Sequence, residues 1–158
     1  MVVIADNHYF SLTYFPEIAV VRFTRTEHPY PSNEEVERLH EQVAPALDRL
    51  GRDTLCLLVD MRSAPLNNAP GFEQSMARAR TLLLRGFPRI SVLVRTAVGA
   101  LQARRYGRED AINVHVFQDE GTAITFLRSL TVDASMPRTG VNDLAPQSSQ
   151  RIRRWGTG

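Results

Sequence analysis

The stretch VDMRSAPLNNAPGFEQSM, residues 59–76, holds the side chains of this sequence that are best placed for chemistry. An apolar run ends in an acid, and the loop beyond it carries an arginine, paired asparagines and two prolines before a glycine. Carboxylate and guanidinium groups bind charged partners, and the free N–H groups at a helix start attract an anionic group. The binding site that this stretch predicts consists of Asp60, Arg62, Asn67, Asn68, Pro70 and Gly71.

The same stretch also has a purely structural interpretation. Asn67 or Asn68 could cap a helix that has Pro70 in its first turn, where the missing N–H costs least. Asp60 could bond to Arg62 or to backbone N–H groups, and the loop would then only shape the chain. The sequence leaves the binding and structural interpretations open.

Other chemistry has little support in the sequence. Cys56 lies inside an apolar run, which favours packing over nucleophilic catalysis, and no Gly-x-Ser-x-Gly motif occurs. The four histidines lie far apart, and no glycine-rich nucleotide loop is present. We therefore predict no catalytic residue, no metal site and no cofactor, and we expect a protein that is not an enzyme.

Composition predicts one compact domain that does not bind nucleic acid. The chain has 158 residues, of which 43% are hydrophobic and 23% charged, as in ordinary globular proteins. The formal net charge is only +2, and all 19 basic residues are arginine. An arginine-only chain with so small a net charge reflects genome base composition better than a nucleic-acid surface.

The sequence also predicts a cytoplasmic protein. Its single cysteine rules out a disulfide framework. The first residues, MVVIADNHYF, have no basic leader, and no run of apolar residues approaches 18. We expect neither secretion nor a membrane span.

Hydrophobic periodicity predicts an α/β fold with a sheet of about five strands. Strands are predicted over residues 8–14, 17–25, 54–59, 90–94 and 112–117. Helices are predicted from Ser32 to Leu50, over 72–83, over 98–106, and from Asp119 to Leu130. An N-terminal hairpin followed by alternating helices and strands implies right-handed crossovers and a largely parallel sheet. An exposed edge strand of this sheet could pair with a second copy, so a homodimer is possible.

The periodicity ends near residue 132, which divides the chain into a domain over 1–131 and a flexible basic tail over 132–158. The last residues form a short basic peptide with an aromatic anchor, which could dock on a partner or an anionic membrane surface. The alternative is a tail that only adds solubility. The docking residues would be Arg151, Arg153, Arg154 and Trp155.

Arginines also gather around the second and third predicted helices. Such residues usually solvate a helix face, but they could instead bind an acidic protein partner or an anionic ligand. They are Arg78, Arg80, Arg85, Arg89, Arg104, Arg105 and Arg108.

Over residues 8–130, the element order resembles a STAS domain, the fold of bacterial anti-sigma-factor antagonists. In that family a buried strand ends in an acid, here Asp60, and an Asp-Ser-Ser-Gly motif then opens the next helix and carries a phosphorylated serine. Asn68-Ala69-Pro70-Gly71 stands at the motif position, so only Gly71 is kept and no residue can accept the phosphoryl group. The resemblance thus implies the fold and a protein-binding loop without the phosphorylation switch.

From this resemblance we expect a non-enzymatic regulatory or adaptor domain of a bacterial signalling system. It would act by binding a regulatory protein partner through the loop that follows Asp60. The alternative is a small-molecule or lipid carrier, because the STAS fold is similar to the CRAL-TRIO lipid-binding fold.

Overall fold

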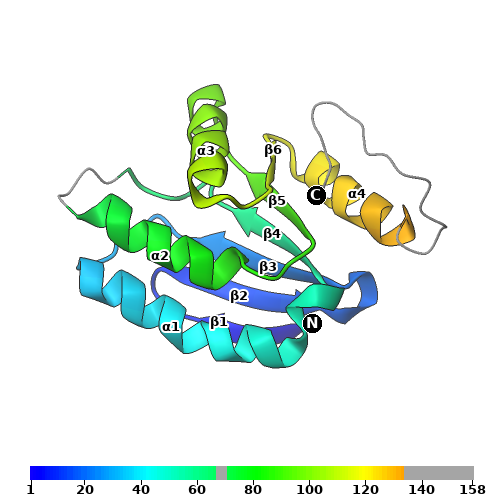
Figure 1. The fold of residues 1–158 in the computed structure, drawn as a ribbon, viewed down its shortest axis with the longest axis horizontal. Coiled ribbons are helices and arrows are strands. Elements are labelled where there is room, and N and C mark those ends of the chain that lie inside the picture. The colour runs from blue at the N-terminus through cyan, green and yellow to red at the C-terminus, as the bar shows by residue number, and fades with distance from the viewer. Residues whose placement is uncertain (67–70, 134–158) are drawn as a thin grey trace.

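A computed structural model describes residues 1–66 and 71–133, which form six strands and four α-helices (Figure 1). The strands are β1 (Val2–Asp6), β2 (Phe10–Phe15), β3 (Val20–Arg25), β4 (Cys56–Asp60), β5 (Arg89–Leu93) and β6 (His115–Phe117). The helices are α1 (Asn33–Leu50), α2 (Phe72–Leu84), α3 (Ala97–Asp110) and α4 (Glu120–Asp133). Short 3-10 turns, η1 (Pro16–Ile18) and η2 (Arg52–Thr54), precede β3 and β4.

The strands form one sheet in the order β1-β2-β3-β4-β5-β6. β1, β2 and β3 pair antiparallel, and β3 to β6 pair parallel. This confirms the predicted α/β fold, with one strand more than the expected five. The sequence did not predict β1 because its run VVIAD lacks the alternation of a half-buried strand, and both Val2 and Val3 are exposed. β1 is also the edge where a second copy would pair, and the homodimer stays a prediction.

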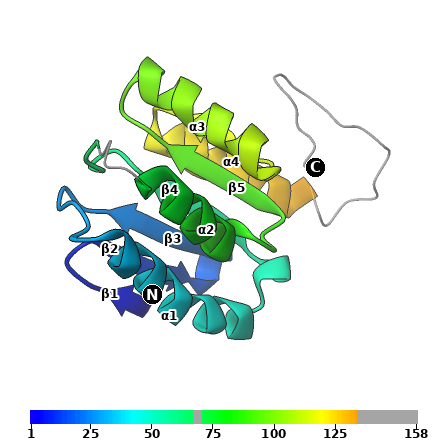
Figure 2. The same cartoon turned by 60° about the vertical axis from the view of Figure 1, so that its left-hand side comes forward.

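Helices cover the two faces of the sheet unequally. Figure 2 shows α1, α2 and α3 in front of the sheet and α4 behind it. Alternate residues of β4 serve both layers: Leu57 and Val59 pack in the main core, whereas Cys56 and Leu58 pack with Leu127 of α4. All five residues of β4 are buried, as its continuous apolar run predicts for a central strand.

The helix ends follow local rules, with one correction to the sequence prediction. Ser32 caps α1 by accepting a hydrogen bond from the Glu35 N–H at 3.1 Å. α2 begins at Phe72, and its cap residue is Gly71 at φ 77°, so the prediction that Asn67 or Asn68 caps this helix with Pro70 in its first turn was wrong. A positive φ costs glycine little, which explains its use at this position.

The remaining boundaries differ from the sequence prediction by a few residues. α3 is longer at both ends than the predicted 98–106, and β6 is shorter than the predicted 112–117. α4 continues to Asp133, two residues past the predicted domain boundary. Residues 134–158, with the predicted docking residues Arg151, Arg153, Arg154 and Trp155, lie outside the described part of the chain. No helix within the described ranges is long and apolar enough to cross a membrane.

Candidate functional site

The segments that follow β4 and β5 meet at one edge of the sheet. Parallel strands present their carboxyl ends together, and open α/β sheets place their sites at this edge. The Met61 N–H donates to the Leu93 carbonyl at 2.8 Å, and the Arg95 guanidinium donates to the Arg62 carbonyl. The loop after β4 and the start of α3 both lie on the left of Figure 2, where the arrowheads of β3 and β5 point. The predicted loop therefore has α3 as its neighbour.

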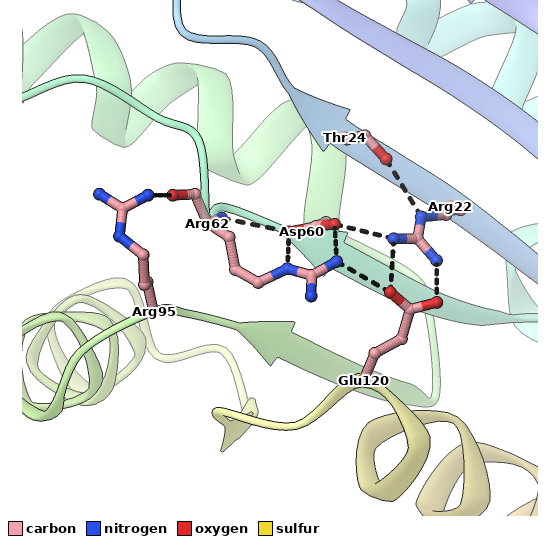
Figure 3. A network of polar contacts seen from close by, with 6 residues as sticks. All are labelled: Arg22, Thr24, Asp60, Arg62, Arg95 and Glu120. Carbon is pink, nitrogen blue, oxygen red and sulfur yellow. Dashed lines mark hydrogen bonds and ion pairs between the residues drawn. The ribbon is translucent and has the colours of Figure 1, made fainter.

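Asp60 ends β4 with its carboxylate held by two arginines (Figure 3). The residue is only 5% exposed. Arg62 binds both carboxylate oxygens, from Nε to Oδ1 at 3.0 Å and from Nη2 to Oδ2 at 2.8 Å, and its backbone N–H donates to Oδ1 at 3.1 Å. Arg22 of β3 donates from Nη2 to Oδ2 at 2.7 Å. Asp60 therefore fixes the first turn of the loop.

Glu120, the first residue of α4, completes this network. Arg22 donates to its two carboxylate oxygens at 3.0 and 3.2 Å, and Arg62 Nη2 donates to Oε1 at 2.8 Å. Thr24 accepts a further bond from Arg22 Nε at 3.2 Å. The two carboxylates and two guanidinium groups balance each other, and they tie β3, β4, the loop and α4 together. We call Arg22, Asp60, Arg62 and Glu120 the charged network.

The ionisation of the charged network follows from these contacts. Burial raises the pKa of Asp60, but the hydrogen bonds from Arg62 and Arg22 outweigh it and leave this pKa below its ordinary value. The hydrogen bond from Arg22 lowers the pKa of Glu120, and the bond to Asp60 raises the pKa of Arg62. All four groups are therefore charged at neutral pH.

These contacts bear on the two interpretations of Asp60. The bonds that the structural interpretation expects, to Arg62 or to backbone N–H groups, are present, and the binding interpretation stays a prediction. A buried carboxylate that two guanidinium groups already hold is poorly suited to bind a partner directly or to act as a general base. Asp60 instead positions Arg62, whose side chain is 37% exposed and can contact a partner.

The other predicted site residues divide into two sets. Gly71 is exposed and starts α2, and a Cβ placed there would lie 3.1 Å from the Asn33 side-chain nitrogen. Asn67, Asn68 and Pro70 lie outside the described residues. The structure therefore brings Asp60 and Arg62 together and puts Gly71 at the far end of the same loop.

α3 presents an unusual surface next to this loop. Its inward face is built from small residues: Ala100 is buried, and Gly107 approaches the segment before β6 so closely that a Cβ would lie 2.9 Å from Val114 Cγ2. Its large apolar residues point the other way, with Val98 74% exposed and Leu101 66% exposed. An ordinary surface helix buries its large apolar side chains, so α3 has the reverse arrangement.

A third large apolar side chain is exposed in the loop itself. Leu66 is 88% exposed. The other exposed large apolar residues of the described chain are Met1, Val2 and Val3, on or next to the outer strand β1. Exposed apolar side chains thus gather on β1 and on the two segments that follow β4 and β5.

Sequence reasoning missed two members of the charged network, Arg22 and Glu120, and the surface of α3. Arg22 and Glu120 lie 98 residues apart, and no local spacing links them. Arg22 lies inside an expected strand and Glu120 at an expected helix start, which was the only signal that could have brought them together. For α3, the small residues at positions 100, 103 and 107 share one face and could have identified its inward side.

Comparison with solved structures supports the fold. The chain is similar to an uncharacterised protein of the DUF3478 family from Shewanella loihica PV-4, which has a SpoIIAA-like fold. The TM-score is 0.57 at 12% sequence identity, and the match covers 78% of this chain and 98% of that one. The fold is SpoIIAA-like. This supports the STAS-like architecture predicted from the element order, and at such low identity it supports the architecture alone. No protein-family model and no curated protein matches the chain.

The SpoIIAA-like fold places the loop after β4 and the start of α2 at the edge where the STAS resemblance expects a binding loop. In the described ranges no group of three or more histidine, cysteine, aspartate or glutamate side chains could hold a metal ion. The features at this edge are therefore a balanced charged network and exposed apolar side chains.

Proposed function

We propose that this chain is a non-enzymatic, cytoplasmic regulatory or adaptor domain that acts by reversible protein–protein contact in a bacterial signalling system. The observation that carries the proposal is the exposure of Leu66, Val98 and Leu101 on the two segments that follow β4 and β5. Exposed apolar side chains on a folded domain mark contact surfaces when they gather at one edge.

The charged network supports a scaffold role for the neighbouring groups. Its ionic groups are bonded to one another, so they hold the start of the loop, at Arg62, in one conformation. A preordered loop loses less conformational entropy on binding than a loose one. The contact surface that we propose includes Arg62, Leu66 and Gly71, and the predicted residues Asn67, Asn68 and Pro70 complete it.

Regulation in this proposal does not use a phosphoserine in the loop. Ala69 and Pro70 stand where the STAS resemblance places serines. Ser75 of α2 is buried, and its hydroxyl donates to Glu37 Oε2 at 2.8 Å. Partner availability, or docking of the basic tail, would set the active state.

Crosslinking in the native cytosol tests the proposal. The tagged protein is captured after mild crosslinking, and wild type is compared with Gly71→Arg, which puts a long cation on the loop edge. Gly71→Ala is the matched control, because it has the same positive φ and the same Cβ contact with Asn33 without the bulk. We expect Gly71→Arg, but not Gly71→Ala, to lose one specific partner. Equal capture by wild type and both variants would contradict the loop surface.

A surface pocket bears on the carrier alternative. It has a volume of about 430 Å³ and lies between the end of α3 and the segment that leads to β6, but it is open to solvent and is not the enclosed cavity that a carrier needs. Arg104 and Arg108 line it, and they suit a small anion better than a lipid chain. Native mass spectrometry of freshly purified protein separates the two functions: a bound small molecule supports the carrier, and bare protein supports the adaptor.

A further inference from the structure

The outer face of α3 is a docking surface in its own right. Val98, Leu101, Arg105 and Arg108 follow one another at spacings of three and four residues, so they share a face. This face is opposite to Ala100 and Gly107, which pack toward the sheet. Because the helix packs through small residues, the exposed valine and leucine are not needed to hold it in place.

Arginines outnumber acids around these apolar residues. From residue 95 to residue 108 the chain has four arginines and no acid, and Glu109 and Asp110 follow at the end of α3. Within the described part of the chain, Arg95, Arg104 and Arg108 form no ion pair. Arg105 lies 3.7 Å from Glu73 and 3.6 Å from Glu109, and both contacts are exposed. The surface therefore combines two apolar side chains with an excess of positive charge.

This charge argues against two possible occupants from the chain itself. A second copy that docked symmetrically would place the same arginines against each other. The C-terminal residues Arg151, Arg153 and Arg154 are also basic, so the tail would be repelled. An anionic membrane matches the charge, but two apolar side chains give only marginal membrane affinity.

We propose that the outer face of α3 binds an acidic amphipathic helix of a partner protein. Residues 95–108 span about 20 Å along a helix axis, which a partner helix of about 14 residues would cover. Val98 and Leu101 would contact its apolar stripe, and Arg95, Arg104 and Arg108 would contact its carboxylates. The inference rests on the proposed adaptor function and adds the class of partner and its place on the fold.

Selection from a display library tests this inference with a defined probe. A library of 16-residue helical peptides is selected against the full chain, and the affinity of the best peptide is measured by fluorescence polarisation. Three proteins are compared: wild type, the double variant Val98→Glu/Leu101→Glu, and the control Val2→Glu/Val3→Glu, which makes the same change at two exposed valines of β1. Circular dichroism checks that each variant is folded.

We expect the enriched peptides to be acidic, with apolar residues at spacings of three and four. Their affinity should fall about tenfold or more in the α3 variant and stay unchanged in the β1 control. Raising the salt concentration should weaken binding to wild type, because the contact is partly ionic.

Several outcomes would overturn the inference. The selection could enrich no peptide, or it could enrich peptides that are neutral or basic. The α3 variant could also bind the best peptide as tightly as wild type does. If wild type binds no peptide but sediments with anionic vesicles, and the α3 variant does not, the face binds a membrane instead. Peptides that lose affinity only with Gly71→Arg, relative to Gly71→Ala, would support the loop surface of the proposed function while rejecting α3.

Discussion

The charged network and the outer face of α3 lie at the same edge of the sheet, yet they differ in how far their groups are satisfied. In the network two carboxylates and two guanidinium groups bond to one another, and Asp60 is almost fully buried. On α3, large apolar side chains are exposed near Arg104 and Arg108, which have no carboxylate partner among the described residues. The charged residues of the network therefore form a structural scaffold, whereas the exposed apolar residues of α3 form the surface that is open to a partner.

The largest expected difference concerns two leucines eight positions apart. Leu93 of β5 is fully buried, whereas Leu101 of α3 is 66% exposed. We expect Leu93→Ala to lower the free energy of unfolding by about 2–5 kcal/mol, because it removes buried area and leaves a cavity. Leu101→Ala should change it by no more than about 0.5 kcal/mol. Urea denaturation measures both, and a large loss in Leu101→Ala would show that α3 is held by its outer face.

The charged network should contribute to stability through Asp60. Replacing Asp60 by alanine leaves Arg22 and Arg62 without their buried acceptor, and we expect a loss of about 1–3 kcal/mol in the free energy of unfolding. The matched control is Asp53→Ala, because Asp53 is exposed in η2 and should tolerate the change without a measurable loss. An equal effect of the two substitutions in the same urea titration would contradict the scaffold role.

The pH dependence of stability should reveal the same network with a smaller effect. The pKa of Asp60 is lower in the folded protein than in the unfolded chain, so its contribution is present above the unfolded value and is lost as the pH falls through the folded value. Wild type should therefore lose more stability between pH 7 and pH 3 than Asp60→Asn. Urea unfolding at the two pH values measures this difference. A larger loss of stability in Asp60→Asn than in wild type would contradict the predicted direction.

The loop should not be phosphorylated by a kinase of a STAS system. Incubation with a serine kinase of a STAS system should leave residues 60–76 unmodified, since Ala69 and Pro70 cannot accept a phosphoryl group and the two serines of the stretch, Ser63 and Ser75, lie outside the motif position. A STAS domain that keeps the Asp-Ser-Ser-Gly motif serves as the positive control. Phosphopeptide mapping by mass spectrometry would contradict the account if it located a phosphate in this stretch.

The sequence predicted the element order well because periodicity and caps are local signals. Ser32 and Gly51 bound α1 where their residue types predict, and the apolar run of β4 is central as expected. β1 was missed because its edge position leaves its valines exposed. Arg22 and Glu120 were missed as members of the charged network because they meet only when β3 and α4 come together across the sheet.

The sequence analysis also did not predict which way α3 faces, although the small residues at positions 100, 103 and 107 mark its inward side. Val98 and Leu101 are ordinary core residues by type, and only the close packing of Gly107 against Val114 turns them outward. Tertiary packing, which local propensity does not encode, therefore determines the candidate surface.

Hydrogen–deuterium exchange of the full chain, alone and bound to the partner captured by crosslinking, tests the central claim most directly. We predict slower exchange in the loop over residues 61–66 and in the first half of α3, over residues 97–104, with β1 unchanged. Slower exchange confined to β1 or α1, with both of these segments unaffected, would contradict the claim that this edge of the sheet is the contact surface.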